Sequence, residues 1–266
     1  AREAQGDDLS IYALRPTTDA RFHPEIARVR AQVSWVPRPT RASDFWLQLS
    51  DSLSHEELRR RFAELAPSIA DLPADEVAQG ISLAASVIDD GIDHLYAHFA
   101  TLAGRMAWLA SRLTGVPYTI TTHAKDIYHE SVDRGWLRRI CGDADRVIAI
   151  SRFNERYLNE VLKDTGARIS LQYNALELER FPYRDPIQPS LPLRIATVGR
   201  LVPKKGFADL IDAVAALDIP VELDIAGSGE LHDDLAARIE RFGLGDRARL
   251  VGPLTQNEVS ELIRSS

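Results

Sequence analysis

Hydrophobic positions along the chain fall into short β-branched runs separated by longer stretches with helical spacing. Nine runs of three to six residues are rich in Val, Ile, Thr and Tyr, which predicts strands. These runs cover residues 9–14, 33–36, 94–99, 118–122, 147–151, 169–173, 193–198, 221–226 and 249–251.

Helical periodicity follows most of the predicted strands. The clearest apolar stripes are Phe99, Leu102, Met106, Leu109 and Leu113; Phe153, Tyr157 and Val161; Phe207, Leu210, Ile211 and Val214; and Leu231, Leu235, Ile239 and Phe242. Strands that alternate with amphipathic helices favour parallel sheets covered on both faces. The predicted fold class is therefore α/β, with two doubly wound, Rossmann-like domains.

The domain boundary is expected where both periodicities lapse. Residues 181–192 contain Pro182, Pro186, Pro189 and Pro192 without strand or helix spacing, so we interpret them as a linker. The N-terminal domain then spans residues 1–180 with six strands, and the C-terminal domain spans residues 193–266 with three.

Both ends of the sequence read as interrupted elements. Residues 1–6 resemble the last turn of a helix that Gly6 terminates, and the capping box Thr255-x-x-Glu258 opens a helix near the other end. We expect further chain on both sides, so that the C-terminal domain is incomplete. A second capping box, Ser54-x-x-Glu57, predicts another helix start.

Composition restricts the class of protein. The net charge of −7 over 266 residues argues against nucleic acid as a partner. The only cysteine, Cys141, cannot form an intramolecular disulfide, and no Cys/His cluster has zinc spacing. No apolar run reaches the ~18 residues that span a bilayer, and no signal peptide is visible. We therefore expect a soluble cytoplasmic protein without a metal site.

Ligands of open α/β sheets bind beyond the carboxyl ends of the strands, where the strand order reverses. That rule selects His98, His123 with Asp126, Ser151, Gly199 with Arg200, and Gly227 with Gly229. If the two domains face each other, these loops line one interdomain cleft.

Residues 198–207 join a strand to a helix through a loop that carries Arg200, Lys204, Lys205 and Gly206. Two of the four lysines of the chain lie here. The helix N-terminus adds free N–H groups and partial positive charge, which favours an anion-binding loop. The alternative is a solvated basic loop with no ligand.

The motif His123-x-x-Asp126 places an imidazole and a carboxylate together after a strand. Such an imidazole can donate to a substrate hydroxyl or to developing charge. In the alternative interpretation Asp126 caps the next helix and His123 closes the loop. Nearby, His98 is expected to reach the cleft and His94 to pack inside. Four residues apart on a strand, these two rings lie ~13 Å apart, so they cannot share one metal ion.

Three further motifs are weaker signals. Gly227-x-Gly229 lacks the third glycine of a dinucleotide fingerprint, so it indicates close backbone approach, for a phosphate, a ribose or packing. Asp143-x-Asp145 precedes a strand and is interpreted as an ordinary loop. The basic runs at residues 59–61 and 134–139 are either solvated faces or contacts for anionic lipid or a lipid pyrophosphate acceptor.

Five segments together resemble the retaining glycosyltransferases of family 4, which have the two-domain GT-B fold. They are residues 94–99, residues 122–128, residues 147–151, Asn174-Ala175-Leu176-Glu177 with Phe181, and residues 198–206. The resemblance implies that Arg200 and Lys205 bind the donor diphosphate and that His123 lies against the donor sugar, with Gly199, Gly227 and Gly229 in the donor site and His98 and Asp126 on the acceptor side.

The same resemblance implies an activity. It is the transfer of a hexose from a nucleotide diphosphate sugar to a saccharide or lipid-linked acceptor, with retention of configuration and without cofactor or metal. Polysaccharide or glycolipid synthesis, with peripheral contact to an anionic inner membrane face, is the implied setting. The alternatives are a GT-B epimerase or hydrolase, which needs no acceptor, and a non-catalytic nucleotide-sugar-binding module.

Departures from the family pattern limit this implication. The glycine-rich loop of the family and its preceding first strand belong before residue 1, and the E-x7-E segment belongs after residue 266. Ala175 replaces a usual glycine. We therefore expect these 266 residues alone to be inactive in transfer.

Overall fold

The computed structural model describes residues 2–17, 24–175, 178–183, 185 and 190–266. It divides into two compact units, Ala1–Asn174 and Ala175–Ser266, and each is described separately here. Pro186 and Pro189 of the predicted linker, like Leu176 and Glu177 of the asparagine motif, lie outside the described residues.

All nine predicted strands are present, and every strand pairing is parallel, as the α/β prediction requires. The first unit contains β1 (Ser10–Ala13), β2 (Gln32–Trp35), β3 (Leu95–His98), β4 (Tyr118–Thr122), β5 (Arg146–Ala149) and β6 (Ile169–Leu171). The second contains β7 (Leu193–Val198), β8 (Val221–Ala226) and β9 (Ala248–Gly252).

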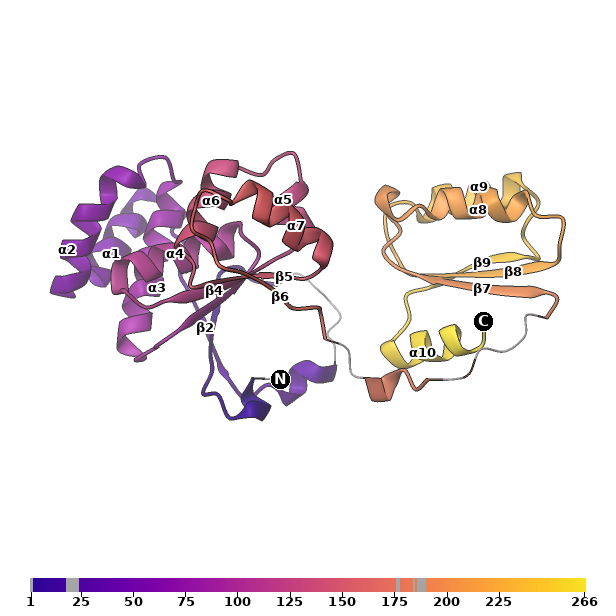
Figure 1. The fold of residues 1–266 in the computed structure, drawn as a ribbon, viewed down its shortest axis with the longest axis horizontal. Coiled ribbons are helices and arrows are strands. Elements are labelled where there is room, and N and C mark those ends of the chain that lie inside the picture. Colours follow the sequence, from indigo (N-terminus) through magenta and orange to yellow (C-terminus); the bar gives the residue numbers. More distant parts are fainter. Residues whose placement is uncertain (1, 18–23, 176–177, 184, 186–189) are drawn as a thin grey trace. The chain divides into compact units, whose positions relative to one another are not determined.

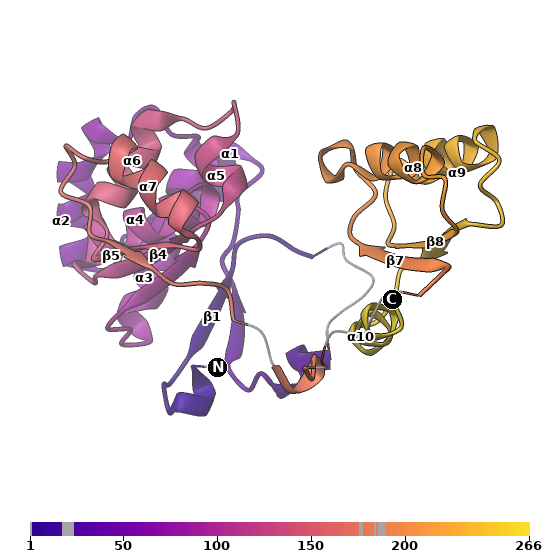
Figure 2. The ribbon, with the colours of Figure 1, turned by 45° about the vertical axis from the view of Figure 1, so that its right-hand side comes forward.

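The six strands of the first unit form two sheets. One has the order β3-β4-β5-β6, and β1 pairs with β2 in a separate ribbon, which Figure 2 shows beside the larger sheet. A cavity of about 600 Å³ lies between them, lined by β1, β3 and α4. In both sheets the strands lie side by side in the same order as in the sequence. The described strands of this unit therefore contain no point at which the strand order reverses.

The described part of the first unit contains seven α-helices. They are α1 (Ala42–Ser52), α2 (Glu56–Leu65), α3 (Ala74–Asp89), α4 (Leu102–Thr114), α5 (Ala124–Tyr128), α6 (Arg134–Asp143) and α7 (Arg152–Val161). Helix α4 packs on β3 and β4 because Met106, Leu109 and Leu113 form a fully buried stripe. Helices α2, α3 and α6 pack around it, and α7 covers β5 and β6.

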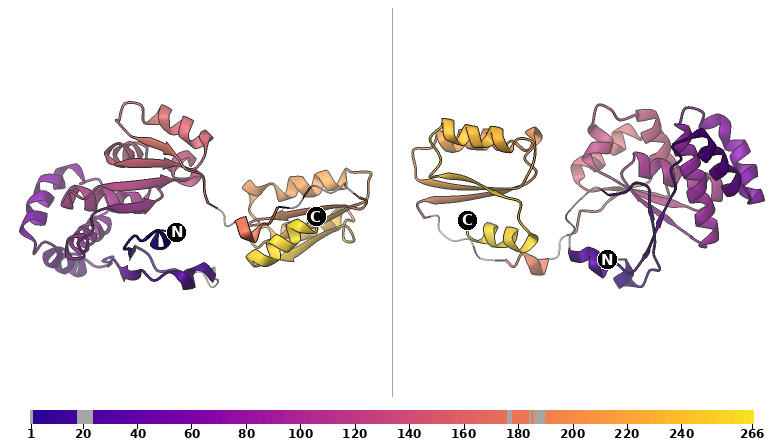
Figure 3. Two further views of the ribbon diagram at one scale, coloured as in Figure 1. Left: turned by 60° about the horizontal axis from the view of Figure 1, so that its bottom comes forward. Right: turned by 180° about the vertical axis from the view of Figure 1, so that it is seen from behind.

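The second unit has three layers. Helices α8 (Phe207–Ala215) and α9 (His232–Arg241) cover one face of the β7-β8-β9 sheet, and α10 (Gln256–Arg264) covers the other (Figure 1). The view from behind in Figure 3 shows the same layers. Phe207, Ile211, Val214, Leu235 and Ile239 form the core between the first two helices and the sheet, which confirms most of their predicted stripes.

Four details of the predicted helices are wrong. Helix α2 begins after His55 rather than Ser54, because Glu57 pairs with Arg60 and Arg61 instead of returning to a cap. The buried face of α7 lies one residue later than predicted, so Phe153 is 65% exposed and Leu158 is buried. Phe242 is also exposed. Phe99 precedes α4 rather than joining its stripe.

Within the described residues, no helix is long and apolar enough to cross a membrane. The same residues contain no group of three or more His, Cys, Asp or Glu side chains arranged to hold a metal ion. Cys141 is free and buried.

The capping box at α10 gives a stability prediction. The Thr255 N–H donates to Glu258 Oε2 (2.6 Å), and the Glu258 N–H donates to Thr255 Oγ1 (3.4 Å). Thr255→Ala should lower the free energy of unfolding of the second unit by about 1 kcal/mol in urea titrations. Ser54→Ala, the matched control at the box that does not form, should change stability by less than ~0.5 kcal/mol. Equal losses in both variants would contradict this assignment.

Candidate functional site

Two histidines meet at the carboxyl ends of β3 and β4. His98 ends β3 and His123 follows β4 directly, and the register aligns His98 with Thr121. His98 Nδ1 lies 3.3 Å from His123 Nε2, and the rings stack with centroids 5.6 Å apart. The structure therefore brings together two of the residues that the sequence selected.

Phe99 adds a strained backbone to this pair. Its φ of 72° is the one positive value among the described non-glycine residues. For a bulky residue that conformation costs on the order of 1–3 kcal/mol and recurs at functional sites. The ring is 44% exposed, and its centroid lies 4.4 Å from that of His123. No sequence signal marks Phe99, because a positive φ is expected only of glycine and, less often, Asn or Asp.

Asp126 takes the capping role that the sequence left open. It is 1% exposed, and both oxygens accept backbone hydrogen bonds: Oδ1 from the His123 N–H (2.8 Å) and Oδ2 from the Ala100 N–H (2.6 Å). Burial raises the pKa of this carboxyl, although the two hydrogen bonds and the nearby His123 oppose the shift. The side chain contacts the protein backbone rather than solvent.

The remaining strand-end residues of the first unit divide by role. Ser151 is the N-cap of α7 and accepts the Asn154 N–H at 3.1 Å, so its position has a structural explanation. His94 is exposed, not packed inside as predicted, because Leu95 and Ala97 take the buried face at β3 and His94 lies on the opposite, exposed face with Tyr96 and His98. Its Nε2 lies 2.9 Å from Thr119 Oγ1.

In the second unit, the loop after β7 is built on the loop after β8. The Gly199 N–H donates to Ala226 O (3.0 Å), and the Leu201 N–H donates to Ser228 O (2.9 Å). A Cβ on Gly227 would lie 1.8 Å from Gly199 O, and one on Gly229 would lie 2.4 Å from Leu201 O. Packing of two backbones thus explains both glycines.

That loop carries uncompensated positive charge. The side chains of Arg200, Lys204 and Lys205 are exposed and form no ion pair or hydrogen bond with any residue that the structure describes. By contrast, Arg194, Arg238 and Arg249 of the same unit each pair with a carboxylate. Gly206, with φ 70°, then opens α8, whose first N–H groups adjoin the cations. Asp209 in the first turn is the nearby opposing charge.

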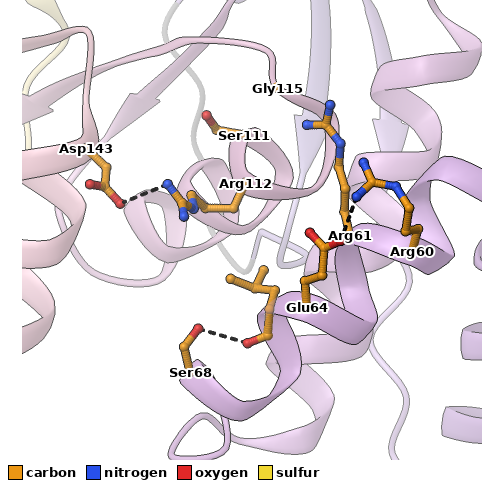
Figure 4. A pocket seen from close by; sticks show the side chains of 9 residues that line it. Arg60, Arg61, Glu64, Ser68, Ser111, Arg112, Gly115 and Asp143 are labelled. Carbon is orange, nitrogen blue, oxygen red and sulfur yellow. Dashed lines mark hydrogen bonds and ion pairs between the residues drawn. The ribbon is translucent and has the colours of Figure 1, made fainter.

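The arginine-rich face of the first unit is balanced by carboxylates. A cavity of about 730 Å³ is lined by Arg60, Arg61, Glu64, Leu65, Ser68, Ser111, Arg112, Gly115 and Asp143. Figure 4 shows these side chains from close by. Arg60 pairs with Glu57 and Glu64, and Arg112 lies 3.9 Å from Asp143. The C-terminal ends of α2 and α4 also adjoin this cavity, and their partial negative charge disfavours anions. These observations favour the solvated-face interpretation of residues 59–61.

Asp143 and Asp145 have structural partners, as an ordinary loop requires. Asp143 accepts the Trp108 indole N–H at 2.7 Å, and Asp145 pairs with Arg168 at 2.5 Å. In the second basic segment, Arg139 stacks over the Trp136 ring at 4.5 Å and donates to Ser68 O.

Comparison with known proteins identifies the chain. Residues 3–180 match the family model "Glycosyltransferase Family 4", and residues 186–266 match "Glycosyl transferases group 1". The chain belongs to glycosyltransferase family 4. The resemblance inferred from the five sequence segments is thereby confirmed.

Individual relatives of this family 4 chain are distant. An uncharacterised glycosyltransferase of Methanocaldococcus jannaschii is 23% identical over 91% of the chain and 68% of its own length. A Campylobacter jejuni transferase, named for adding N-acetylgalactosamine to a diphospho-undecaprenol-linked saccharide, is 28% identical over 49% of the chain and 36% of itself. The chain thus spans about a third to two thirds of these relatives.

Solved structures agree on the fold. HepE of Anabaena, crystallised with UDP, has a TM-score of 0.54 and 20% identity, and the match covers 70% of this chain and 54% of HepE. At that identity the similarity shows the GT-B fold alone. The α/β, Rossmann-like prediction for this family 4 chain is confirmed.

The contact between the two loops of the second unit predicts a large stability loss. Gly227→Ala should lower the free energy of unfolding of that unit by at least about 2 kcal/mol, because the Cβ meets Gly199 O and the φ of 147° is strained. Gly245→Ala, with nothing within 4 Å of the new Cβ, is the control for the substitution itself. Urea unfolding of both variants measures the difference. A Gly227→Ala variant with an unchanged free energy of unfolding would refute the close approach of the two loops.

The histidine pair predicts a pH dependence. The pKa of the His98 imidazole lies below its ordinary value because the ring is partly desolvated and because His123 would repel a second positive charge. The unfolded chain then binds more protons than the folded one below pH ~6.5, so stability falls as pH drops through this window. His98→Gln should flatten that fall in denaturation midpoints measured between pH 7 and 5, whereas His94→Gln should preserve it. A slope that His98→Gln leaves unchanged would contradict the shift.

Proposed function

We propose that this chain serves the transfer of a hexose from a nucleoside diphosphate sugar to a saccharide or lipid-linked acceptor, with retention of configuration. The observation that carries the proposal is the unpaired cationic loop formed by Arg200, Lys204 and Lys205. Membership of glycosyltransferase family 4 supports it, as do the UDP and UDP-glucose complexes of HepE.

The donor role follows from where charge develops. When the bond between the anomeric carbon and the phosphate oxygen breaks, negative charge grows on the departing diphosphate. Preplaced cations stabilise that charge more in the transition state than in the ground state, which lowers the barrier. Arg200 and Lys205 supply the cations, with the α8 N-terminus beside them, and the loop needs no metal ion for this task. Gly199, Gly227 and Gly229 hold it against the next loop.

The acceptor role is assigned to the first unit. His123 lies against the donor sugar and His98 on the acceptor side, where neutral imidazoles can exchange hydrogen bonds with sugar hydroxyls. The leaving phosphate removes the proton of the attacking hydroxyl, on the same face of the sugar, which gives retention. The name of the Campylobacter jejuni relative supports a lipid-linked acceptor. Contact with an anionic membrane stays a prediction. Arg60 and Arg61, which could contact anionic lipid, are already paired with carboxylates.

Two other functions fit the same donor loop. An epimerase or hydrolase would convert the sugar nucleotide without an acceptor, and a binding module would leave it intact. Chromatography of UDP-glucose after incubation of the full-length protein with and without acceptor separates the three, because only a transferase makes product formation depend on acceptor.

Titration calorimetry with UDP, and with GDP in parallel, tests the phosphate contact. Arg200→Ala and Lys205→Ala should each weaken diphosphate binding by roughly 10- to 100-fold, since a hydrogen bond to a charged group contributes ~1.5–3 kcal/mol. Uridine binding should change less than two-fold. Arg194→Ala is the matched control, because this exposed arginine, on the strand β7 that precedes the loop, pairs with Glu222. Equal losses of affinity for UDP and for uridine would contradict the phosphate-binding role of these two residues.

A further inference from the structure

We propose that Asp126 is a positioning residue whose buried carboxylate fixes the separation of the His98 and His123 imidazoles by joining the two loops that carry them. The catalytic consequence of this proposal rests on the function proposed above. The geometric part stands independently of it.

The carboxylate continues the hydrogen-bond ladder between β3 and β4. Among the described residues, the last backbone hydrogen bond from one strand to the other runs from the Phe99 N–H to Thr121 O, at 2.9 Å. Beyond that point the strands end and the loops diverge. The Ala100 N–H then donates to Asp126 Oδ2 and the His123 N–H to Asp126 Oδ1, so the side chain supplies the next link.

Each oxygen serves a different loop, which makes the link a bridge. Ala100 lies two residues after His98, and the other donor is the backbone of His123 itself. Movement of either loop would leave one carboxylate oxygen without its partner in a buried place, at a cost of ~1–3 kcal/mol. The two imidazoles are therefore held at their 3.3 Å approach by main-chain contacts rather than by their own weak interaction.

The bridge also accounts for the backbone of Phe99. Its N–H is held by Thr121 O, its carbonyl accepts the Gly104 N–H at 3.0 Å, and the next N–H is held by Asp126. A positive φ persists in a bulky residue only when its surroundings over-determine it. These three bonds supply that constraint and present the Phe99 ring to His123.

Burial keeps the bridge away from water. Asp126, Ile127 and Cys141 are almost completely buried. The titratable groups that face the carboxylate are His123, after β4, and Cys141, on α6. Burial raises the pKa of the Asp126 carboxyl above its ordinary range, and burial together with the Asp126 charge raises that of the Cys141 thiol to about 12.

The chain offers a matched pair of aspartates for the test. Asn has one acceptor oxygen and one NH₂ donor, so Asp126→Asn must lose one of the two loop bonds. Asp133 caps α6 through one oxygen, which accepts the Trp136 N–H at 3.0 Å. Because Asn is an equally good cap, Asp133→Asn should retain its contact. Any difference between the two variants therefore measures the effect of losing the second oxygen of Asp126.

NMR of the wild-type chain gives the first measurement and needs no variant. The amide signals of Ala100 and His123 should shift with one common midpoint as Asp126 titrates, and that midpoint should lie above the ordinary carboxyl range of ~4. Different midpoints for the two amides, or no shift in either, would overturn the bridge.

The imidazole signals give the second measurement. In the wild type, His123→Gln should move the titration midpoint of His98, because the charge of His123 is one cause of the lowered pKa of the His98 imidazole. In an Asp126→Asn background that displacement should fall at least two-fold, and in an Asp133→Asn background it should persist. Undiminished coupling in folded Asp126→Asn would overturn the positioning role, whatever the activity.

A transfer assay on the full-length protein separates this inference from the proposed function. Asp126→Asn should lower kcat by about 10- to 100-fold with little change in the KM for donor, because small misplacement of a group at the reacting centre is costly. Lost coupling without a fall in kcat would support the bridge and overturn the role of His123 in transfer.

Discussion

Burial of β4 on both faces is the constraint around which the first unit is organised. Tyr118, Ile120, Thr121 and Thr122 are each at most 4% exposed, so no side chain of this central strand except Thr119 reaches solvent appreciably. Thr122 Oγ1 donates to Ile148 O on the adjacent strand, which fixes the last residue of β4 as well. The chain leaves the sheet at one defined point, and His123 is the first residue beyond it.

The two units hold their functional loops by different physical means. In the first unit a buried carboxylate collects N–H groups from separate loops, so hydrogen bonding sets the positions of the imidazoles. In the second unit the absence of side chains at Gly227 and Gly229 lets two backbones touch, so steric fit sets the position of the cationic loop. The first arrangement responds to pH, because Asp126 and His98 titrate. The second responds to side-chain volume alone.

Much of the fold could be predicted because periodicity reports directly on burial. Strands β4, β7 and β8 have the predicted boundaries, since β-branched residues recur along each of these runs. The positive φ of Phe99 could not be predicted, because it results from tertiary hydrogen bonds to Thr121, Gly104 and Asp126. His94 was misplaced for a related reason. The sequence predicts a strand but does not reveal which of the two faces of β3 is covered.

The sequence also did not reveal which charged side chains are paired. Arg60 and Arg200 are the same residue type in basic segments of similar appearance, yet Arg60 contacts two carboxylates and Arg200 contacts none among the described residues. Helical spacing brings Glu57 and Glu64 to Arg60, three and four residues away. No comparable periodicity surrounds Arg200, so only the folded structure distinguishes the two.

The contrast between the cationic loop and the rest of the chain has a kinetic consequence. A protein with a net charge of −7 repels small anions on average, whereas three neighbouring unpaired cations attract them over about one Debye length, ~8–10 Å in physiological salt. An approaching anion is thereby repelled by most of the surface and attracted to the N-terminus of α8. The capture rate of an anionic ligand should therefore depend on ionic strength more steeply than its residence time, because steering acts before contact and screening weakens it first.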